Sequence, residues 1–160
     1  MLEVKFYDTV DDSLLKFAVI ISQSNGKWVF CKHKERDTYE VPGGHREAGE
    51  NILETAKREL QEETGAIKFD IKPVCVYSVI GKTRVNDTGE ESFGGLYFAE
   101  ISEFAKELHS EMEKVVLMDE LPDDWTYPEI QPRLLEEARQ RGFLPKKDEI
   151  KWLFFDVGST

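Results

Sequence analysis

The stretch that decides the fold is residues 39–66, which read YEVPGGHREAGENILETAKRELQEETGA. Five glutamates gather in it behind a Gly-Gly pair: Glu50, Glu54, Glu59, Glu62 and Glu63. Like charges spaced four residues apart destabilise a helix by about 0.2–0.5 kcal/mol per pair. A cluster of carboxylates as dense as this one therefore requires a compensating cause.

The second half of this stretch carries the signals of one amphipathic helix. Asn51 and Glu54 form a capping-box pattern at its start, and Gly65 is a typical helix stop. The apolar residues that recur at helical spacing, and that we expect to face the core, are Ile52, Leu53, Ala56 and Leu60.

Glu59, Glu62 and Glu63 stand at i, i+3 and i+4, which places three carboxylates on one face within a single turn. A solvated acidic surface is the common explanation of such a face. However, Glu62 and Glu63 also lie near the helix C-terminus, where the macrodipole disfavours anions. A divalent cation removes both costs, and carboxylate oxygens are the ligands that Mg²⁺ prefers. The pattern therefore indicates a metal site.

Length and composition predict one domain over residues 1–160, because 160 residues with 40% hydrophobic and 33% charged side chains suit a single core. No apolar run is long enough for a membrane helix, and the acidic N-terminus is unlike a signal peptide, so we expect a cytoplasmic protein. Cys31 and Cys75 are expected to be buried free thiols. The net charge of −11 disfavours long nucleic acids as partners but not a small phosphorylated ligand.

The rest of the chain predicts a mixed sheet and a second main helix. Asn25-Gly26 is a hairpin signal, 34–38 is a charged loop, and Pro42-Gly43-Gly44 is a turn. Strands are expected at 17–21, 28–31, 39–41, 67–80 with a break at Pro73, 93–101 with a bulge at Gly94-Gly95, and 115–117; the helix is expected at 127–141, opening near Pro128.

The same stretch resembles the box of the Nudix hydrolase superfamily, G-x5-E-x7-R-E-U-x-E-E-x-G-U, where U is a bulky aliphatic residue. Gly44 is followed after five residues by Glu50, and seven residues later comes the run from Arg58 to Gly65. Every charged and glycine position matches over residues 44–66. The one departure is Ala66 at the last aliphatic position, with Ile67 directly behind it.

The resemblance implies an α/β/α sandwich with a central mixed β-sheet, and hydrolysis of a phosphoanhydride bond in a nucleoside diphosphate linked to a further group. It implies Mg²⁺, or Mn²⁺ in its place, bound by Glu59, Glu62 and Glu63 with the carbonyl of Gly44. Arg58 would hold the glutamates, and Glu50 would contact the metal shell or the loop backbone. Because consecutive helical residues point about 100° apart, we expect Arg58 to reach Glu50 and the backbone of the loop at 44–49. The general base would be Glu59 or a glutamate outside the box.

A further metal ligand is expected from a glutamate in a later loop. Glu111, just before the strand at 115–117, is preferred over Glu113 and Glu100.

The substrate side is less clearly marked. Arg36, with Lys34, could contact phosphates or be solvated, and Trp125 and Tyr127 could stack on a base or pack the second helix onto the sheet. His45 is expected to be an exposed position rather than a ligand. The apolar segment 150–157 is consistent with an edge strand, a lid or a dimer contact, so a homodimer stays open.

Within the resemblance, the leading function is a pyrophosphohydrolase acting on a nucleoside triphosphate, including an oxidised one, as in the MutT-type branch. Hydrolysis of ADP-ribose or a dinucleoside polyphosphate is the alternative within the enzyme class. A non-catalytic nucleotide sensor would carry a damaged box or a DNA-binding partner domain, and this chain shows neither. An isoprenoid diphosphate isomerase would need a cysteine in the site.

Overall fold

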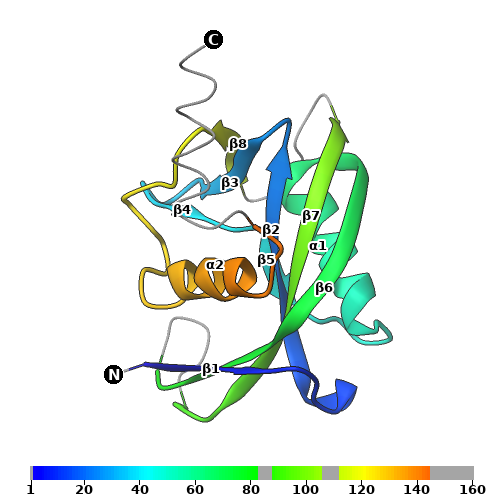
Figure 1. Cartoon of the computed structure of the whole chain (residues 1–160), viewed down its shortest axis with the longest axis vertical. Helices are drawn as coiled ribbons and strands as arrows, with labels where there is room; N and C mark the ends of the chain where they lie inside the picture. Colours follow the sequence, from blue (N-terminus) through cyan, green and yellow to red (C-terminus); the bar gives the residue numbers. More distant parts are fainter. Residues whose placement is uncertain (1, 83–87, 106–111, 145–160) are drawn as a thin grey trace.

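The computed structural model describes residues 2–82, 88–105 and 112–144. Their elements in chain order are β1 (Glu3–Tyr7), a 3-10 turn (Asp12–Leu14), β2 (Leu15–Ser24), β3 (Lys27–His33), β4 (Tyr39–Glu40), β5 (Gly43–His45), α1 (Ile52–Thr64), β6 (Ala66–Ile80), β7 (Ser92–Phe104), β8 (Met112–Met118) and α2 (Gln131–Gln140). In Figure 1 the long strands form a twisted layer with α1 and α2 on opposite sides. The predicted mixed sheet between two helices is therefore confirmed.

The central strand β2 determines where the site lies. It pairs in parallel with β7 and in antiparallel with β3 and β5, while β6 and β1 extend the sheet beyond β7. Because β3 pairs only with residues 22–24 of β2, the first half of β2 is free to accept β5. This pairing places Gly44 opposite Ala18 and Gly43 opposite Val19.

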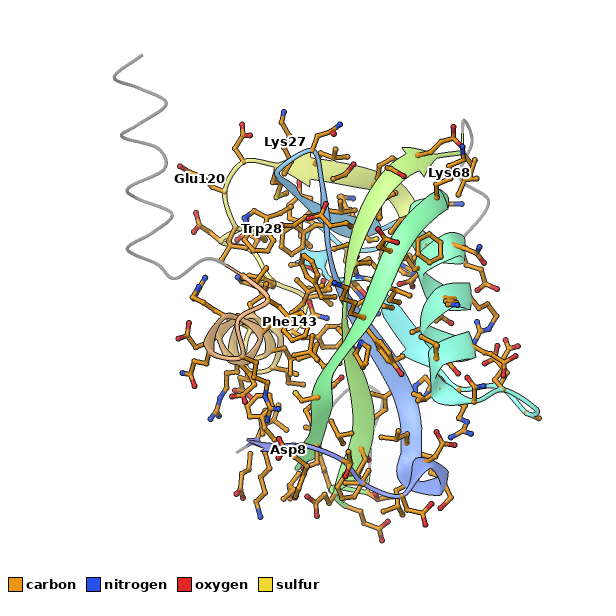
Figure 2. The ribbon with its side chains drawn as sticks, turned by 45° about the vertical axis from the view of Figure 1, so that its right-hand side comes forward. Asp8, Lys27, Trp28, Lys68, Glu120 and Phe143 are labelled. Carbon is orange, nitrogen blue, oxygen red and sulfur yellow. The ribbon has the colours of Figure 1, made fainter. Side chains whose placement is uncertain are left out.

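Each face of the sheet buries its own apolar cluster. The cluster under α1 includes Ile20 and Leu60, and the cluster under α2 includes Phe30 and Leu134, all four nearly inaccessible to solvent. Trp28 on β3 and Phe143 just beyond α2 also belong to the α2 side (Figure 2). Burial of this area on both faces is the main term that stabilises the sandwich.

Helix α1 has the predicted ends. Asn51 accepts a hydrogen bond from the Glu54 N–H, and the Glu54 carboxylate accepts one from the Asn51 N–H, both at 2.9 Å. Gly65 closes the helix in the left-handed region with φ 75°. The capping box and the glycine stop are confirmed.

The predicted core face of α1 is wrong at one position. Ile52, Ala56 and Leu60 are buried, but Leu53 is 38% exposed and Thr55 is fully buried in its place. Consecutive helical residues point about 100° apart, so Leu53 turns away from the stripe that Ile52 defines. Thr55 is tolerated inside because its hydroxyl donates to Glu50 Oε1 at 3.0 Å.

Two strand predictions need correction. Residues 66–80 form one continuous strand rather than a strand broken at Pro73, because the irregularity is only a register shift between Pro73 and Cys75. The expected bulge at Gly94-Gly95 lies instead on the neighbouring β2, between Leu15 and Phe17. At Gly94 a Cβ would lie 2.1 Å from the Phe17 ring, so this glycine makes room for an aromatic side chain.

Other boundaries also shift. Residues 43–45, expected within a turn, form strand β5, and α2 begins at Gln131 rather than near Pro128, with Pro132 in its first turn. Strand β1 was not predicted, although its sequence EVKFY alternates polar and apolar residues from Glu3 to Phe6. The hairpin at Asn25-Gly26, the free buried cysteines and the strand containing 115–117 are confirmed.

The segment 150–157 lies outside the described residues. Among the described helices, neither α1 nor α2 has the length and apolar character that crossing a membrane requires.

Candidate active site

The loop that carries the site is anchored along the first half of β2. The Ile20 N–H donates to the carbonyl of Pro42 at 2.9 Å. Gly43 approaches β2 so closely that a Cβ on it would lie 2.6 Å from the carbonyl oxygen of Ala18. The glycine therefore permits backbone contact between the loop and the strand.

Gly44 lies directly against the carboxylate of Glu59. A Cβ at Gly44 would lie 2.3–2.5 Å from the three carboxylate atoms of Glu59, whose side chain is 12% exposed. Any side chain at position 44 would displace this carboxylate. Gly44, the first glycine of the box, and the Glu59 carboxylate thus share one small space.

Arg58 connects the loop to the acidic face of α1. Its Nε donates to Glu50 Oε2 at 2.6 Å, and its Nη2 donates to the carbonyl of His45 at 2.9 Å. Its Nη1 donates to Glu59 Oε1 at 2.7 Å and to Glu62 Oε2 at 3.3 Å. The guanidinium therefore reaches the two partners expected from the sequence, Glu50 and the loop backbone, and also fixes two box glutamates.

Glu50 is the most strongly held anion of this network. The hydrogen bond from Arg58, followed by the bond from the Glu47 N–H, lowers the pKa of Glu50 to about 2. The pKa of Arg58 is raised, first by its bond to Glu50. Both groups stay charged at any pH at which the enzyme would work, so their pairing is a fixed part of the site.

Glu63 has the opposite environment. Its Oε1 accepts a hydrogen bond from the Gly43 N–H at 2.7 Å, which ties the last turn of α1 to the loop. Burial raises the pKa of Glu63 to about 9, and the nearby charges of Glu59, Glu40 and Glu62 add to the shift. Burial likewise raises the pKa of Glu59. Without a cation, this corner holds more carboxylates than it can keep ionised.

This arrangement fits a hard divalent cation. Its donors are carboxylate oxygens, and a cation would offset both the burial and the neighbouring carboxylates that raise the pKa of Glu63. In the described part of the chain, no three acidic, histidine or cysteine side chains converge as an ion would require. The reason is visible in the contacts, because Arg58 separates Glu59 from Glu62 and Glu63 is turned toward Gly43. Each of these three carboxylates uses one oxygen in the bonds named here, so a cation would take the second oxygen.

A cavity of about 520 Å³ opens beside the acidic corner. Gly43, Gly44 and Glu63 lie on one part of its wall, and Lys16, His33, Arg36 and His45 supply the basic or imidazole groups. Aromatic and aliphatic side chains from the sheet and α2 complete it: Phe17, Val19, Val41, Tyr77, Val79, Tyr127, Ile130 and Leu134. A wall of this mixed character suits a ligand with an anionic part and a flat apolar part.

Of the three later glutamates considered as further metal ligands, only Glu100 has a described side chain. Glu111 lies outside the described residues, as does the side chain of Glu113. Glu100 lies opposite Gln23, five residues along the paired strands from Ala18, which is about 16 Å at 3.3 Å per residue. Glu100 is therefore not at the site.

Of the two basic residues that could contact phosphates, one lies at the cavity and the other does not. Arg36 lines the cavity and lies 3.4 Å from Glu40, whereas Lys34 is exposed and does not line it. His45 is exposed, as expected, but also borders the cavity.

Of the two aromatic candidates, only one lies at the cavity. Trp125 packs edge-on against Phe30 with ring centres 5.4 Å apart, which is the structural role that the sequence left open. Tyr127 lines the cavity wall.

Two polar residues of the cavity were missed from the sequence. Glu40, 7% exposed, precedes the Pro-Gly-Gly segment, and Gln131, 5% exposed, begins α2. Gln131 shares its helix face with Leu134 and Ala138, so a polar residue on an apolar stripe was the available signal. For Glu40 the signal was a charged residue in a short strand. Such a residue can be exposed or buried, and only the pairing of β4 with β3 decides which.

A family model for the NUDIX domain matches residues 13–138. The chain belongs to the Nudix family. It is 34% identical over 123 residues to the protein named putative 8-oxo-dGTP diphosphatase YtkD of Bacillus subtilis, covering 76% of this chain and 73% of that protein.

Solved structures share the fold of this chain. The pyrophosphohydrolase BsRppH of Bacillus subtilis superposes with a TM-score of 0.72 at 28% identity, over 89% of this chain and 92% of that one. The NUDIX domain of Shewanella oneidensis NrtR, solved with ADP ribose, shares the fold at 19% identity and a TM-score of 0.58, over 79% and 87% of the two chains.

Membership confirms the reaction class predicted from the sequence. The chain is a Nudix hydrolase that cleaves phosphoanhydride bonds, and use of a divalent metal is typical of its family.

Arg58→Lys should lower kcat/KM by about 10–100-fold, because a lysine cannot keep a planar fork on Glu50, Glu59 and the His45 carbonyl at once. The melting temperature should change much less than activity, since the loss is one of carboxylate positioning. Steady-state kinetics and thermal unfolding measure the two effects. Arg133→Lys, an exposed change on α2, is the control, and wild-type kinetics in Arg58→Lys would show that Arg58 is only a surface cation.

In metal-free protein, stability should fall as pH rises from about 4.5 to about 9. Over that window folded Glu63 keeps its proton, because its pKa is raised from 4.5 to about 9, while the unfolded chain releases it. Glu63→Gln removes this term, so in chelator at pH 8 it should melt several degrees above wild type. Thermal unfolding at pH 5, 7 and 9 tests this. Parallel curves for wild type and Glu63→Gln would contradict it.

Proposed function

We propose that the chain is a Mg²⁺-dependent pyrophosphohydrolase whose substrate is a nucleoside triphosphate, including an oxidised one. The observation that carries this proposal is the cavity with basic and aromatic walls that Gly44 and Glu63 line, together with the Glu59 carboxylate that lies against Gly44. The named activities of YtkD and BsRppH, a diphosphatase and a pyrophosphohydrolase, support it.

In this proposal Glu59, Glu62, Glu63 and the carbonyl of Gly44 hold the cation, with Glu111 as a further ligand. A bound Mg²⁺ would neutralise phosphate oxygens, orient them and lower the pKa of a bound water. Mn²⁺ would substitute, because it also prefers oxygen ligands.

The chain's own residues position the metal-binding carboxylates and remove a proton from the attacking water. Arg58 and Glu50 keep the loop and α1 in register, which keeps the carboxylates in place. A carboxylate, Glu59 or one outside the box, accepts the proton of the attacking water. Arg36 contacts a phosphate, since it lines the cavity and, within the described residues, its ion pair is with Glu40 at 3.4 Å.

ADP-ribose and dinucleoside polyphosphates remain the alternative substrates. The NrtR domain solved with ADP ribose shares only the fold with this chain, so it favours neither substrate class.

Isomerisation of an isoprenoid diphosphate has less support. Cys31 is fully buried with its Sγ donating to the Glu63 carbonyl at 3.5 Å, and burial raises its pKa well above the usual value, which keeps it an unreactive thiol.

A substrate panel with Mg²⁺ or Mn²⁺ tests the proposal. It should contain dGTP, 8-oxo-dGTP, ADP-ribose and a dinucleoside tetraphosphate, with pyrophosphate and phosphate measured separately. We expect pyrophosphate and a nucleoside monophosphate from the triphosphates. Faster cleavage of ADP-ribose or of the dinucleoside would replace this substrate assignment by the alternative.

A further inference from the structure

Gln131 is a buried polar group that the reaction itself does not use. It is 5% exposed, begins α2 and lines the cavity. A buried amide without hydrogen bonds costs about 1–3 kcal/mol by mutational measures, so each of its polar atoms requires an account.

The orientation of this amide is fixed by chemistry. The backbone N–H of Val41 donates to Gln131 Oε1 at 2.8 Å, and a backbone N–H can only donate. The alternative flip would place two donors face to face. Gln131 therefore directs its Nε2, with two N–H donors, away from Val41.

That Nε2 is available to a ligand. It makes no hydrogen bond to another residue of the described part of the chain. Within those residues, no fully buried side-chain nitrogen or oxygen lacks a partner, so Nε2 keeps contact with the cavity. The cavity thus presents a donor of fixed direction among apolar and aromatic groups.

The neighbours of Gln131 suit a flat ring. Leu134 follows one turn later on the same helix face, and Val41, Tyr77 and Val79 belong to the same apolar cluster and line the same cavity. Gly44 and Glu63 line this cavity too, and the cation site proposed there would take the phosphates. The base of a bound nucleotide is then the part that meets Gln131.

We propose that Gln131 reads the base by donating from Nε2 to the carbonyl oxygen at position 6 of a purine. Guanine and hypoxanthine nucleotides carry this acceptor, whereas adenine carries an amino donor there and would face Gln131 donor to donor. The preference applies equally to a guanine oxidised elsewhere on the ring. This inference rests on the proposed nucleoside triphosphate activity.

Wild-type kinetics give the first test. We expect kcat/KM for both dGTP and dITP to exceed that for dATP by about tenfold or more. The first two would accept a buried hydrogen bond from Gln131 Nε2, whereas dATP would place its amino donor against that donor. dITP is included because it differs from dATP at position 6 without the 2-amino group of guanine. Equal rates on dITP and dATP would overturn the inference without any variant.

Two variants give the second test. Gln131→Glu keeps an oxygen for the Val41 N–H and presents an acceptor to the cavity, so the dITP-to-dATP ratio should fall at least tenfold. Gln131→Met removes donor and acceptor alike and should bring the ratio near one. The change should appear mainly in KM, and thermal unfolding checks that both variants fold.

Gln140→Glu is the matched control, because Gln140 is exposed on the same helix and away from the cavity. Its ratio should equal that of wild type. An unchanged ratio in both Gln131 variants overturns the role of Gln131 while leaving the proposed function intact. No hydrolysis of any nucleoside triphosphate by the wild type would instead overturn the proposed function.

Discussion

Glu63→Gln should lower kcat by about a hundredfold or more while the protein stays folded. A metal ion supplies several kcal/mol of transition-state stabilisation, and each 1.4 kcal/mol corresponds to about tenfold in rate. The amide has the size of the carboxylate but cannot neutralise a cation. The Gly43 N–H can still donate to its oxygen, so the link between loop and helix persists. Glu62→Gln should behave similarly.

Glu54→Gln is the control for this loss. Glu54 belongs to the same acidic stretch, yet its carboxylate accepts a hydrogen bond from the Asn51 N–H at the opposite end of α1. A glutamine retains an acceptor there, so activity should stay within about twofold of wild type and stability should change by well under 1 kcal/mol. Equal losses of kcat in Glu54→Gln and Glu63→Gln would mean that the active face of α1 has been misplaced.

Chelation should abolish turnover, and added Mg²⁺ or Mn²⁺ should restore it. The physical reason is that burial, with the added charges of Glu59, Glu40 and Glu62, raises the pKa of Glu63, and a bound cation would offset both effects. A cation that binds only the folded state also stabilises it, by about 2.7 kcal/mol at a free concentration of 100 Kd.

Activity assays and thermal unfolding with and without chelator measure both effects. Full turnover in excess chelator would exclude a metal-dependent reaction, and an unchanged melting temperature would exclude a cation bound to the native state.

The local signals in the sequence were sufficient for the two ends of helix α1. Asn51, Glu54 and Gly65 act through neighbours within a few residues, so their pattern predicts the caps directly. The box spacing likewise brought Arg58 to Glu50, because both ends of that contact are fixed by the helix and the short loop before it.

Features that depend on distant strands could not be predicted in the same way. Whether Gly43 and Gly44 form a turn or a strand depends on the free edge of β2, which exists only because β3 pairs with three residues of it. The direction of the Glu63 side chain depends on that pairing, and the burial of Glu40 depends on the pairing of β4 with β3. Pro73 is tolerated within β6 because the ladder to β7 shifts its register between Pro73 and Cys75.

The cavity residues show the same limit. Gln131 belongs to the site because α2 packs across the sheet and meets Val41, 90 positions earlier in the chain. Sequence periodicity marks its helix face as apolar but does not reveal which backbone N–H it meets.

Mn²⁺ binding followed by electron paramagnetic resonance tests the central claim most directly, because it observes the cation without any substrate. Wild type and Glu54→Gln should bind Mn²⁺ with the same affinity, and Glu59→Gln and Glu63→Gln should each bind at least about tenfold more weakly. Addition of Mg²⁺ should displace the bound Mn²⁺. Equal Mn²⁺ affinity in all four proteins would contradict a metal site at Gly44, Glu59 and Glu63.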